Sequence, residues 1–128
     1  MSILIEVSPG ELIDKLTILE IKLELIEDES KRSSVRREYG LLKSVYQTAI
    51  VENELLHELI ATLKRINREL WDIEDNIRAE ERAQRFGSRF IELARSVYRT
   101  NDRRAVVKRQ INTLLNSPIP EEKSYTHY

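Results

Sequence analysis

The chain has 128 residues, 41% of them hydrophobic and 34% charged, and its formal net charge at pH 7 is −1. A charge this close to neutral argues against a protein that grips nucleic acid along its whole surface. Cysteine is absent, which excludes disulfides, thiolate zinc sites and thiol nucleophiles. Only three glycines and three prolines accompany the abundant Leu, Ile, Glu, Lys and Arg, and this mixture predicts an all-α fold with long helices.

The amino-terminal residues predict an extended arm followed by a helix. Residues 1–8 are mostly apolar but too few for a helix, so we interpret them as an arm packed on another surface or as an edge strand. Ser8 then fits an N-cap, Pro9 fits the first helical position, and Glu11 completes a capping box with the serine. These residues predict a helix over residues 9–28.

A second helix, long and without a break, is predicted over residues 34–85. Its apolar residues follow one another in alternating steps of three and four, which is the spacing of a helix seam that meets a partner helix. At 1.5 Å per residue this helix would be a rod of roughly 75 Å. Only Glu52 interrupts the series, and the rival interpretation is a compact monomeric bundle in which the helix breaks near residues 52–54.

A third helix is predicted over residues 88–116. Gly87 suits the left-handed position that ends the long helix, and Ser88 can cap the helix that follows. Two prolines then begin a tail over residues 117–128. Because short turns force neighbouring helices to run antiparallel, we expect a single helical domain in which the first and last helices each cover half of the rod.

The middle of the predicted rod is apolar on most sides. A helix that is apolar all round is buried all round, and a layer two helices thick leaves that surface uncovered. We therefore predict a homo-oligomer resembling a coiled coil, most simply a dimer with a two-fold axis near the middle of the rod. The predicted interface residues are Ile50, Val51, Leu55, Leu59 and Ile60.

Four segments of the chain together resemble a known family. They are Val7–Leu19 (VSPGELIDKLTIL), Leu70–Asp75 (LWDIED), Asn101–Ala105 (NDRRA) and Glu121–Tyr125 (EEKSY). Through these segments the sequence resembles, over nearly its whole length, a family of short, helical bacterial and viral proteins of unknown function. The resemblance implies a self-contained helical domain, and it implies no particular activity or catalytic residue.

Acidic residues supply one alternative function. Carboxylate pairs three or four residues apart on facing helices can bind Mg²⁺ or Mn²⁺ through oxygen, as they do in all-α nucleotide pyrophosphohydrolases. A metal-dependent phosphohydrolase is therefore the alternative, although a solvated acidic face is the favoured interpretation and we predict no metal, cofactor or catalytic residue. The candidate ligands are Glu69, Asp72 and Asp75, with Glu20, Glu24 and Glu27 on the first helix.

The last helix is basic and supplies a second alternative, phosphate or nucleic-acid binding. Antiparallel pairing about Gly87 sets this helix beside the acidic end of the preceding one. Neutralisation between the two helices is therefore the favoured interpretation, and we do not expect nucleic acid as a partner. The basic residues are Arg85, Arg89, Arg95, Arg99, Arg103, Arg104, Lys108 and Arg109.

Polar residues interrupt the apolar faces of the predicted helices. Asp14 and Thr17 interrupt the first helix, and Lys108 interrupts the last. Asn67 and Asn101 lie on or beside apolar stripes. Buried polar groups must be hydrogen-bonded and often fix helix register and partner number, while a position at the rim is the alternative interpretation.

Trp71 is the only tryptophan, and acidic residues follow it. We interpret it as an anchor of the core or of the hairpin, with a platform for a ligand as the alternative. The sequence contains neither a glycine-rich phosphate loop nor a serine elbow, and we predict a structural or interaction module rather than an enzyme. With no secretory signal and no apolar run of 18 residues, we expect a cytoplasmic protein with no membrane span and an as yet unidentified protein partner.

Overall fold

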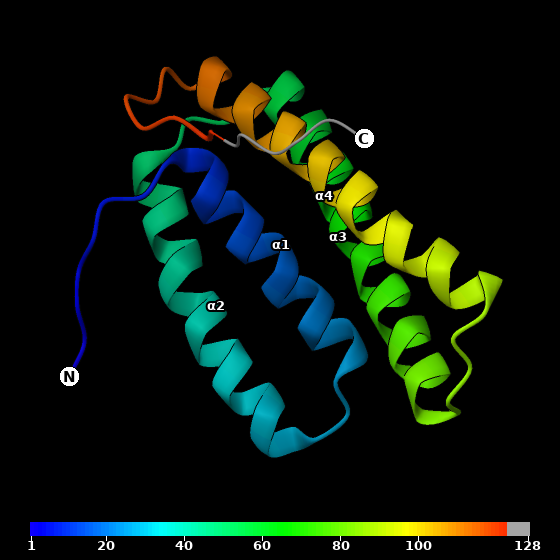
Figure 1. Cartoon of the computed structure of the whole chain (residues 1–128). Helices are drawn as coiled ribbons and strands as arrows, with labels where there is room; N and C mark the ends of the chain where they lie inside the picture. Colours follow the sequence, from blue (N-terminus) through cyan, green and yellow to red (C-terminus); the bar gives the residue numbers. More distant parts are fainter. Residues whose placement is uncertain (123–128) are drawn as a thin grey trace.

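The computed structural model describes residues 1–122, and these residues form α-helices and no strand (Figure 1). The prediction of an all-α helical bundle is confirmed. Within the described residues, no helix combines the length and the apolar character needed to cross a membrane. The tail predicted over residues 117–128 and the segment EEKSY both extend into residues 123–128, which lie outside the described residues. The helices are α1 (Pro9–Leu25), α2 (Glu29–Ala49), α3 (Glu54–Arg82) and α4 (Ser88–Leu114).

Two helical hairpins make up the fold, one formed by α1 and α2 and the other by α3 and α4 (Figure 1). Among the described helices, α1 alone packs against all the others, while α2 packs mainly on α1. The first hairpin therefore reaches the second through α1, and the contacts of that helix hold the two hairpins together.

The prediction of one unbroken helix over residues 34–85 is wrong, because the chain leaves the helix at Ile50 and enters a new one at Glu54. The backbone of Ile50 is extended (φ −113°, ψ 127°), a conformation that β-branched residues favour. Asn53 then caps α3, and its side-chain oxygen accepts a hydrogen bond from the backbone N–H of Leu56 at 2.8 Å. Sequence periodicity continued across the break because Leu56 still points into the core, where its side chain is fully buried.

A single carboxylate links the two sides of this break. Glu52 accepts hydrogen bonds from the phenol of Tyr46 and from Nε2 of His57, the latter at 2.6 Å. The hydrogen bonds from His57 and Tyr46 hold the pKa of Glu52 below its ordinary value. Burial and the bond to Glu52 raise the pKa of Tyr46 to about 12, so this phenol stays neutral and keeps donating.

The start of α2 also differs from the prediction. The two predicted helices leave residues 29–33 between them, but these are the first residues of α2 because Asp28 acts as the N-cap. Its Oδ1 accepts hydrogen bonds from the backbone N–H groups of Ser30 and Lys31. The guanidinium of Arg32 in turn donates to the carbonyl oxygens of Leu23 and Ile26, which are left without helical partners at the end of α1.

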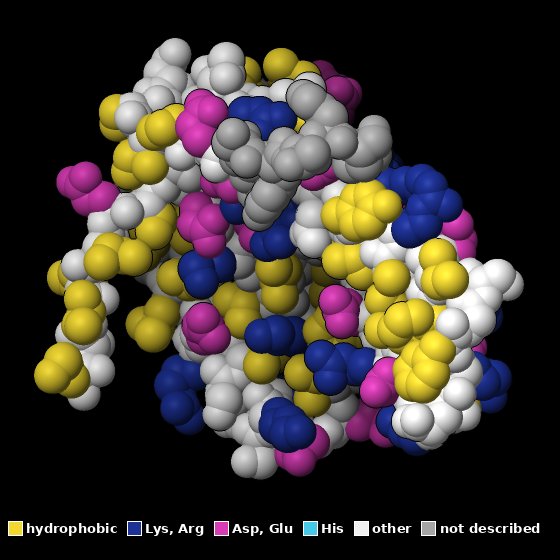
Figure 2. Space-filling view, viewed as in Figure 1, with side chains coloured by type: hydrophobic (Ala, Val, Ile, Leu, Met, Phe, Trp, Pro, Cys, Tyr) yellow, Lys and Arg dark blue, Asp and Glu magenta, His cyan; other side chains and the backbone are white. Residues whose placement is uncertain are grey.

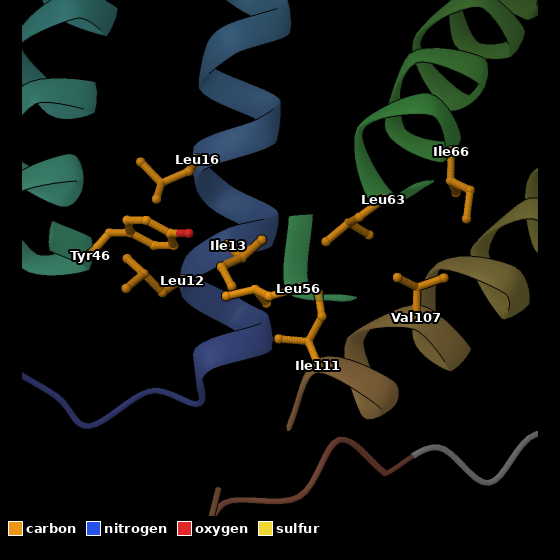
Figure 3. Close-up of a cluster of buried hydrophobic side chains, with 9 residues drawn as sticks. All are labelled: Leu12, Ile13, Leu16, Tyr46, Leu56, Leu63, Ile66, Val107 and Ile111. Carbon is orange, nitrogen blue, oxygen red and sulfur yellow. The ribbon is translucent and has the colours of Figure 1, made fainter. Parts of the chain in front are cut away.

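All four helices contribute to one hydrophobic core near the first turns of α1 (Figure 3). Tyr46 of α2 lies against Leu12 and Leu16 of α1, and Leu56 of α3 points between α1 and α4 (Figure 3). A core to which every helix contributes fixes the relative placement of the two hairpins. The buried core residues are Leu12, Ile13, Leu16, Tyr46, Leu56, Leu63, Ile66, Val107 and Ile111.

The turn between α3 and α4 corrects the role predicted for Gly87. Gly87 has φ −84° and ψ −153° and precedes α4 as its N-cap, so it does not occupy the left-handed position. That position belongs to Gln84, whose φ is 56°. The backbone N–H of Gln84 bonds to the carbonyl of Glu81 and that of Arg85 to Glu80, which is the Schellman pattern of a helix end.

We predict that Gln84→Gly stabilises the protein by about 0.5–1 kcal/mol, because glycine adopts a positive φ without the steric cost of a Cβ. The control is Gly87→Ala, since a Cβ at Gly87 would meet no atom within 4 Å and its φ is ordinary. Thermal melts of both variants measure the effect. A loss of stability in Gln84→Gly together with a clear loss in Gly87→Ala would show that the helix ends at Gly87 after all.

The same turn contains a buried carboxylate, and it makes stability depend on pH. Arg85 hydrogen-bonds Glu80 at 2.8 Å and Arg89 approaches it at 3.3 Å, while the Glu80 side chain is only 8% exposed. The hydrogen bond from Arg85, followed by the charges of both arginines, holds the pKa of Glu80 below its ordinary value.

A carboxylate with a lowered folded-state pKa stabilises the fold above its unfolded pKa of about 4.3, and that contribution is lost as the pH falls through the folded value. We therefore expect Glu80→Gln to be less stable than the wild type in urea at neutral pH. The difference should shrink between neutral and acid pH, because the wild-type carboxylate becomes protonated once the pH falls below its lowered pKa. A difference that stays constant between the two pH values would contradict an ionic role for Glu80.

Candidate functional site

A buried cluster of polar side chains lies where α1 meets α3 and α4. Its centre is the carboxylate of Asp14, whose side chain is 2% exposed. Arg104 of α4 donates to Asp14 through Nε at 2.9 Å and through Nη2. Asn67 of α3 donates from Nδ2 to Asp14 Oδ1 and to Thr17 Oγ1, both at 2.9 Å. The Thr17 hydroxyl donates to the carbonyl oxygen of Asp14 at 2.8 Å, so the donor groups of Asn67 and Thr17 both have acceptors.

The cluster is held together by its charges as well as by its hydrogen bonds. A buried carboxylate without a counter-charge is strongly unfavourable, and two parallel N–H donors from one guanidinium are the geometry that best compensates it. The hydrogen bonds from Arg104 to Asp14 raise the pKa of the guanidinium, which therefore stays charged. The pairing of Asp14 with Arg104 therefore helps to fix the orientation of α1 on the second hairpin.

A second ionic cluster joins the start of α1 to α4 and to the chain after it. Nζ of Lys108, whose side chain is 8% exposed, lies 2.8 Å from Glu11 and 3.2 Å from Glu121. Burial lowers the pKa of Lys108, but the hydrogen bonds and charges of the surrounding carboxylates outweigh it and leave the pKa above its ordinary value. Lys108 therefore links Glu11 and Glu121, which lie near opposite ends of the sequence.

Gly10 lets α1 and α4 approach closely at this point. Its backbone N–H donates to Oδ1 of Asn112 at 2.7 Å. A Cβ at position 10 would lie 2.7 Å from the carbonyl oxygen of Lys108 and 2.8 Å from the Asn112 oxygen, closer than such atoms can pack. Within the described part of the chain, Nδ2 of Asn112 is buried without a hydrogen-bond partner.

The segments on which the family resemblance rests come together around these clusters. Asp14 belongs to the first segment, Trp71 to the second, Arg104 to the third and Glu121 to the fourth. Asp14 is bonded to Arg104, which lines one groove with Trp71, and Glu121 is paired with Lys108 one helical turn after Arg104. Residues far apart in the sequence therefore build one region of the surface and the polar interior beneath it.

A groove of about 500 Å³ opens beside the buried cluster, between α1, α3 and α4. Trp71 and Leu70 give it an apolar wall, and Asn67 and Arg104 connect it to Asp14 below. A volume of this size is within the range of small-molecule sites. The remaining lining residues are Ile18, Glu74, Asp75, Arg78 and Asn101.

The carboxylates considered as metal ligands do not form a common site. Glu69 pairs with Arg103 at 2.8 Å, and Asp72 pairs with Arg68 at 3.4 Å. Asp75 lines the groove beside Trp71. Among the described residues, no three His, Cys, Asp or Glu side chains are grouped as a metal site would require.

Two acidic residues of α1, Glu20 and Glu24, contact α3. Lys64 of α3 lies 2.7 Å from Glu24 and 3.7 Å from Glu20. The break at Ile50 explains this contact, because it turns the start of α3 back toward α1. These carboxylates thus take part in helix packing.

Most basic residues of the last helix are neutralised by nearby carboxylates. Arg103 pairs across the hairpin with Glu69, while Arg99 pairs at 3.6 Å with Glu92 of its own helix. Arg104 and Lys108, two of the basic residues considered for phosphate binding, both project inward. The sequence indicated that Lys108 is unusual, because it interrupts the apolar face of α4. It did not indicate the role of Arg104, because the partner of this residue lies 90 residues away and no local pattern identifies it.

The predicted interface residues fall into two groups. Val51 and Leu55 are exposed, at 85% and 52%. Ile50, Leu59 and Ile60 are only partly buried, and they pack against the hydrophobic core of their own chain. Leu55 and Leu59 line a second groove of about 600 Å³ between α3 and α4, together with Val106, Arg109, Gln110, Thr113 and Leu114.

The fold and the polar interior define a small all-α protein in which two helical hairpins are joined through a buried ion pair. The chain belongs to a family of unknown function, DUF6165, whose model matches residues 3–128. The match covers nearly the whole chain and includes every element described above. Comparison with curated proteins and with solved structures found no match.

We predict that Asp14→Ala destabilises the protein by at least about 2 kcal/mol, because it leaves Arg104 and Asn67 without their buried acceptor. Asp72→Ala is the matched control, since Asp72 is an exposed partner of Arg68 and such pairs contribute about 0–1 kcal/mol. Urea denaturation followed by circular dichroism measures both. Equal losses in the two variants would contradict a special role for the buried carboxylate.

Proposed function

We propose that this protein is an interaction module that assembles as a homodimer through its amino-terminal arm and the groove between α3 and α4. The single observation that carries the proposal is the arm itself. Ile3, Leu4 and Ile5 are exposed at 76%, 99% and 77%, although they form a nearly continuous apolar run. Figure 2 shows hydrophobic side chains along the amino-terminal arm, which stands away from the helices.

The groove between α3 and α4 offers a surface that matches the arm in chemistry. Leu55 and Val106, two of its lining residues, are exposed at 52% and 43%. Burying one Leu or Ile side chain contributes about 1.5–3 kcal/mol, so three aliphatic side chains provide a substantial driving force for association. Charge also matches, since Glu6 is the one charged residue of the arm and Arg109 lines the groove.

The position of the arm suits a reciprocal exchange between two copies. Gly10, just after the arm, is bonded to Asn112, which is next to the groove residue Thr113. The base of the arm therefore lies near the end of α4 that lines the groove, while the arm itself runs away from the helices (Figure 1). In a two-fold dimer each copy can give its arm to the partner and receive the partner's arm. Seven extended residues span at most about 25 Å, enough to cross onto a neighbouring subunit.

The test is molar mass by light scattering at micromolar concentration. The wild type is expected at twice the chain mass, and a variant with Ile3, Leu4 and Ile5 all replaced by serine is expected at one chain mass. Leu55→Glu should have the same effect from the groove side, because it places a charge where the arm binds. Leu59 and Ile60 are poor test positions, because each packs against the core and its substitution would unfold the chain.

The control is Leu41→Ser, since Leu41 is equally apolar and 67% exposed on α2, away from the groove. This variant should remain a dimer. A wild-type chain of monomeric mass would refute the proposal, and dimers that persist in both the arm variant and Leu55→Glu would show that another surface forms the interface. Circular dichroism of each variant confirms that the helices are intact.

A further inference from the structure

The groove beside Trp71 contains polar groups that the fold leaves unused. Asn67 is 5% exposed, and within the described residues both of its hydrogen bonds are donated by Nδ2. The amide cannot be reversed, because the Asp14 carboxylate accepts hydrogen bonds and does not donate them. Oδ1 of Asn67 is therefore an acceptor left for a ligand in the groove that this residue lines.

Donors and a further acceptor lie around the same groove. A guanidinium has five N–H donors, and Arg104 uses three of them on Asp14 and Asn101, so two remain. Among the described residues, the carboxylate of Asp75 forms no ion pair or hydrogen bond, and it lines the groove. A ligand placed here would meet donors and acceptors side by side.

The apolar wall and the charges of the groove further restrict the class of ligand that it can bind. The half-buried indole of Trp71 offers a flat apolar face. The positive charge of Arg104 is cancelled by Asp14 and that of Arg78 by Glu74, 3.8 Å away, so no net positive charge is left to attract an anion. Hydroxyl groups can accept from Arg104 and donate to Asn67 or Asp75, and a ring that carries them can pack its C–H face on tryptophan.

We propose that this groove binds a neutral, hydroxyl-rich ring, the chemistry of a sugar unit. Trp71 packs on the ring, Asn67 and Asp75 accept from its hydroxyl groups, and Arg104 donates to them. The Asp14 carboxylate acts below the site by holding Arg104 and Asn67 in position. This site is separate from the proposed dimer interface, since the groove between α3 and α4 that receives the arm shares no lining residue with it.

Because the chain has one tryptophan, its fluorescence reports directly on this groove. The experiment titrates the full chain with glucose, galactose, mannose, N-acetylglucosamine and myo-inositol, each to about 50 mM, a range that covers the millimolar affinities expected of single rings. At least one of these probes should give a saturable change. Choline and inorganic phosphate, tested in the same way, should give none.

Asp75→Ala should weaken the binding of the responding probe by about tenfold or more, the effect of losing one good hydrogen bond in a polar site. The matched control is Asp72→Ala on the same helix, which should bind within about twofold of the wild type because Asp72 does not line the groove. No saturable response to any neutral ring would overturn the proposal. So would a response to choline or phosphate alone, or an equal loss of binding in Asp72→Ala.

Discussion

The structure depends on the neutralisation of one carboxylate, that of Asp14. A side chain that is 2% exposed cannot keep a negative charge without compensation, and the compensation comes from two other helices. Arg104 supplies the opposite charge from α4, and Asn67 supplies a further donor from α3. The helix α1 is therefore fixed on the second hairpin in one orientation, in which all three side chains meet. The apolar contacts around Leu12 and Ile13 bury surface between the helices, while the polar cluster fixes the orientation in which the helices pack.

The same constraint leaves two separate surfaces of the protein exposed. The polar cluster uses the inward-facing atoms of Arg104 and Asn67 and leaves others facing the groove beside Trp71. The exposed arm follows from the same docking, because Gly10 brings the first turn of α1 against α4 and leaves residues 1–7 beyond the helices. One set of contacts thus positions both the groove proposed to bind a small ligand and the arm proposed to bind a second copy of the chain. The first surface is polar and has no uncompensated positive charge, and the second is apolar.

Local sequence patterns predicted the helices well where a cap or a periodic face defined them. The Ser8–Pro9 start is an example, since Ser8 accepts from the N–H of Glu11 at 3.1 Å. Periodicity failed at Ile50, because Leu56 keeps the spacing of the seam while the backbone between them is extended. The prediction that Gly87 ends the helix was wrong for a different reason. Gln84 has the left-handed conformation that glycine more often adopts. Polar interruptions in apolar stripes indicated Asp14 and Asn67, whereas Arg104 could be paired only once the helices were placed in space.

The most direct test of this account is a double-mutant cycle between Asp14 and Arg104, measured by urea denaturation of the wild type, each alanine variant and the double variant. Residues in contact within one buried network couple by about 0.5–3 kcal/mol, while independent sites add within about 0.5 kcal/mol. We predict a coupling free energy of at least about 1.5 kcal/mol, because either substitution alone leaves a charge without its partner. A coupling that is indistinguishable from zero would show that the apolar core alone fixes α1, and it would contradict the central role given to the Asp14 carboxylate.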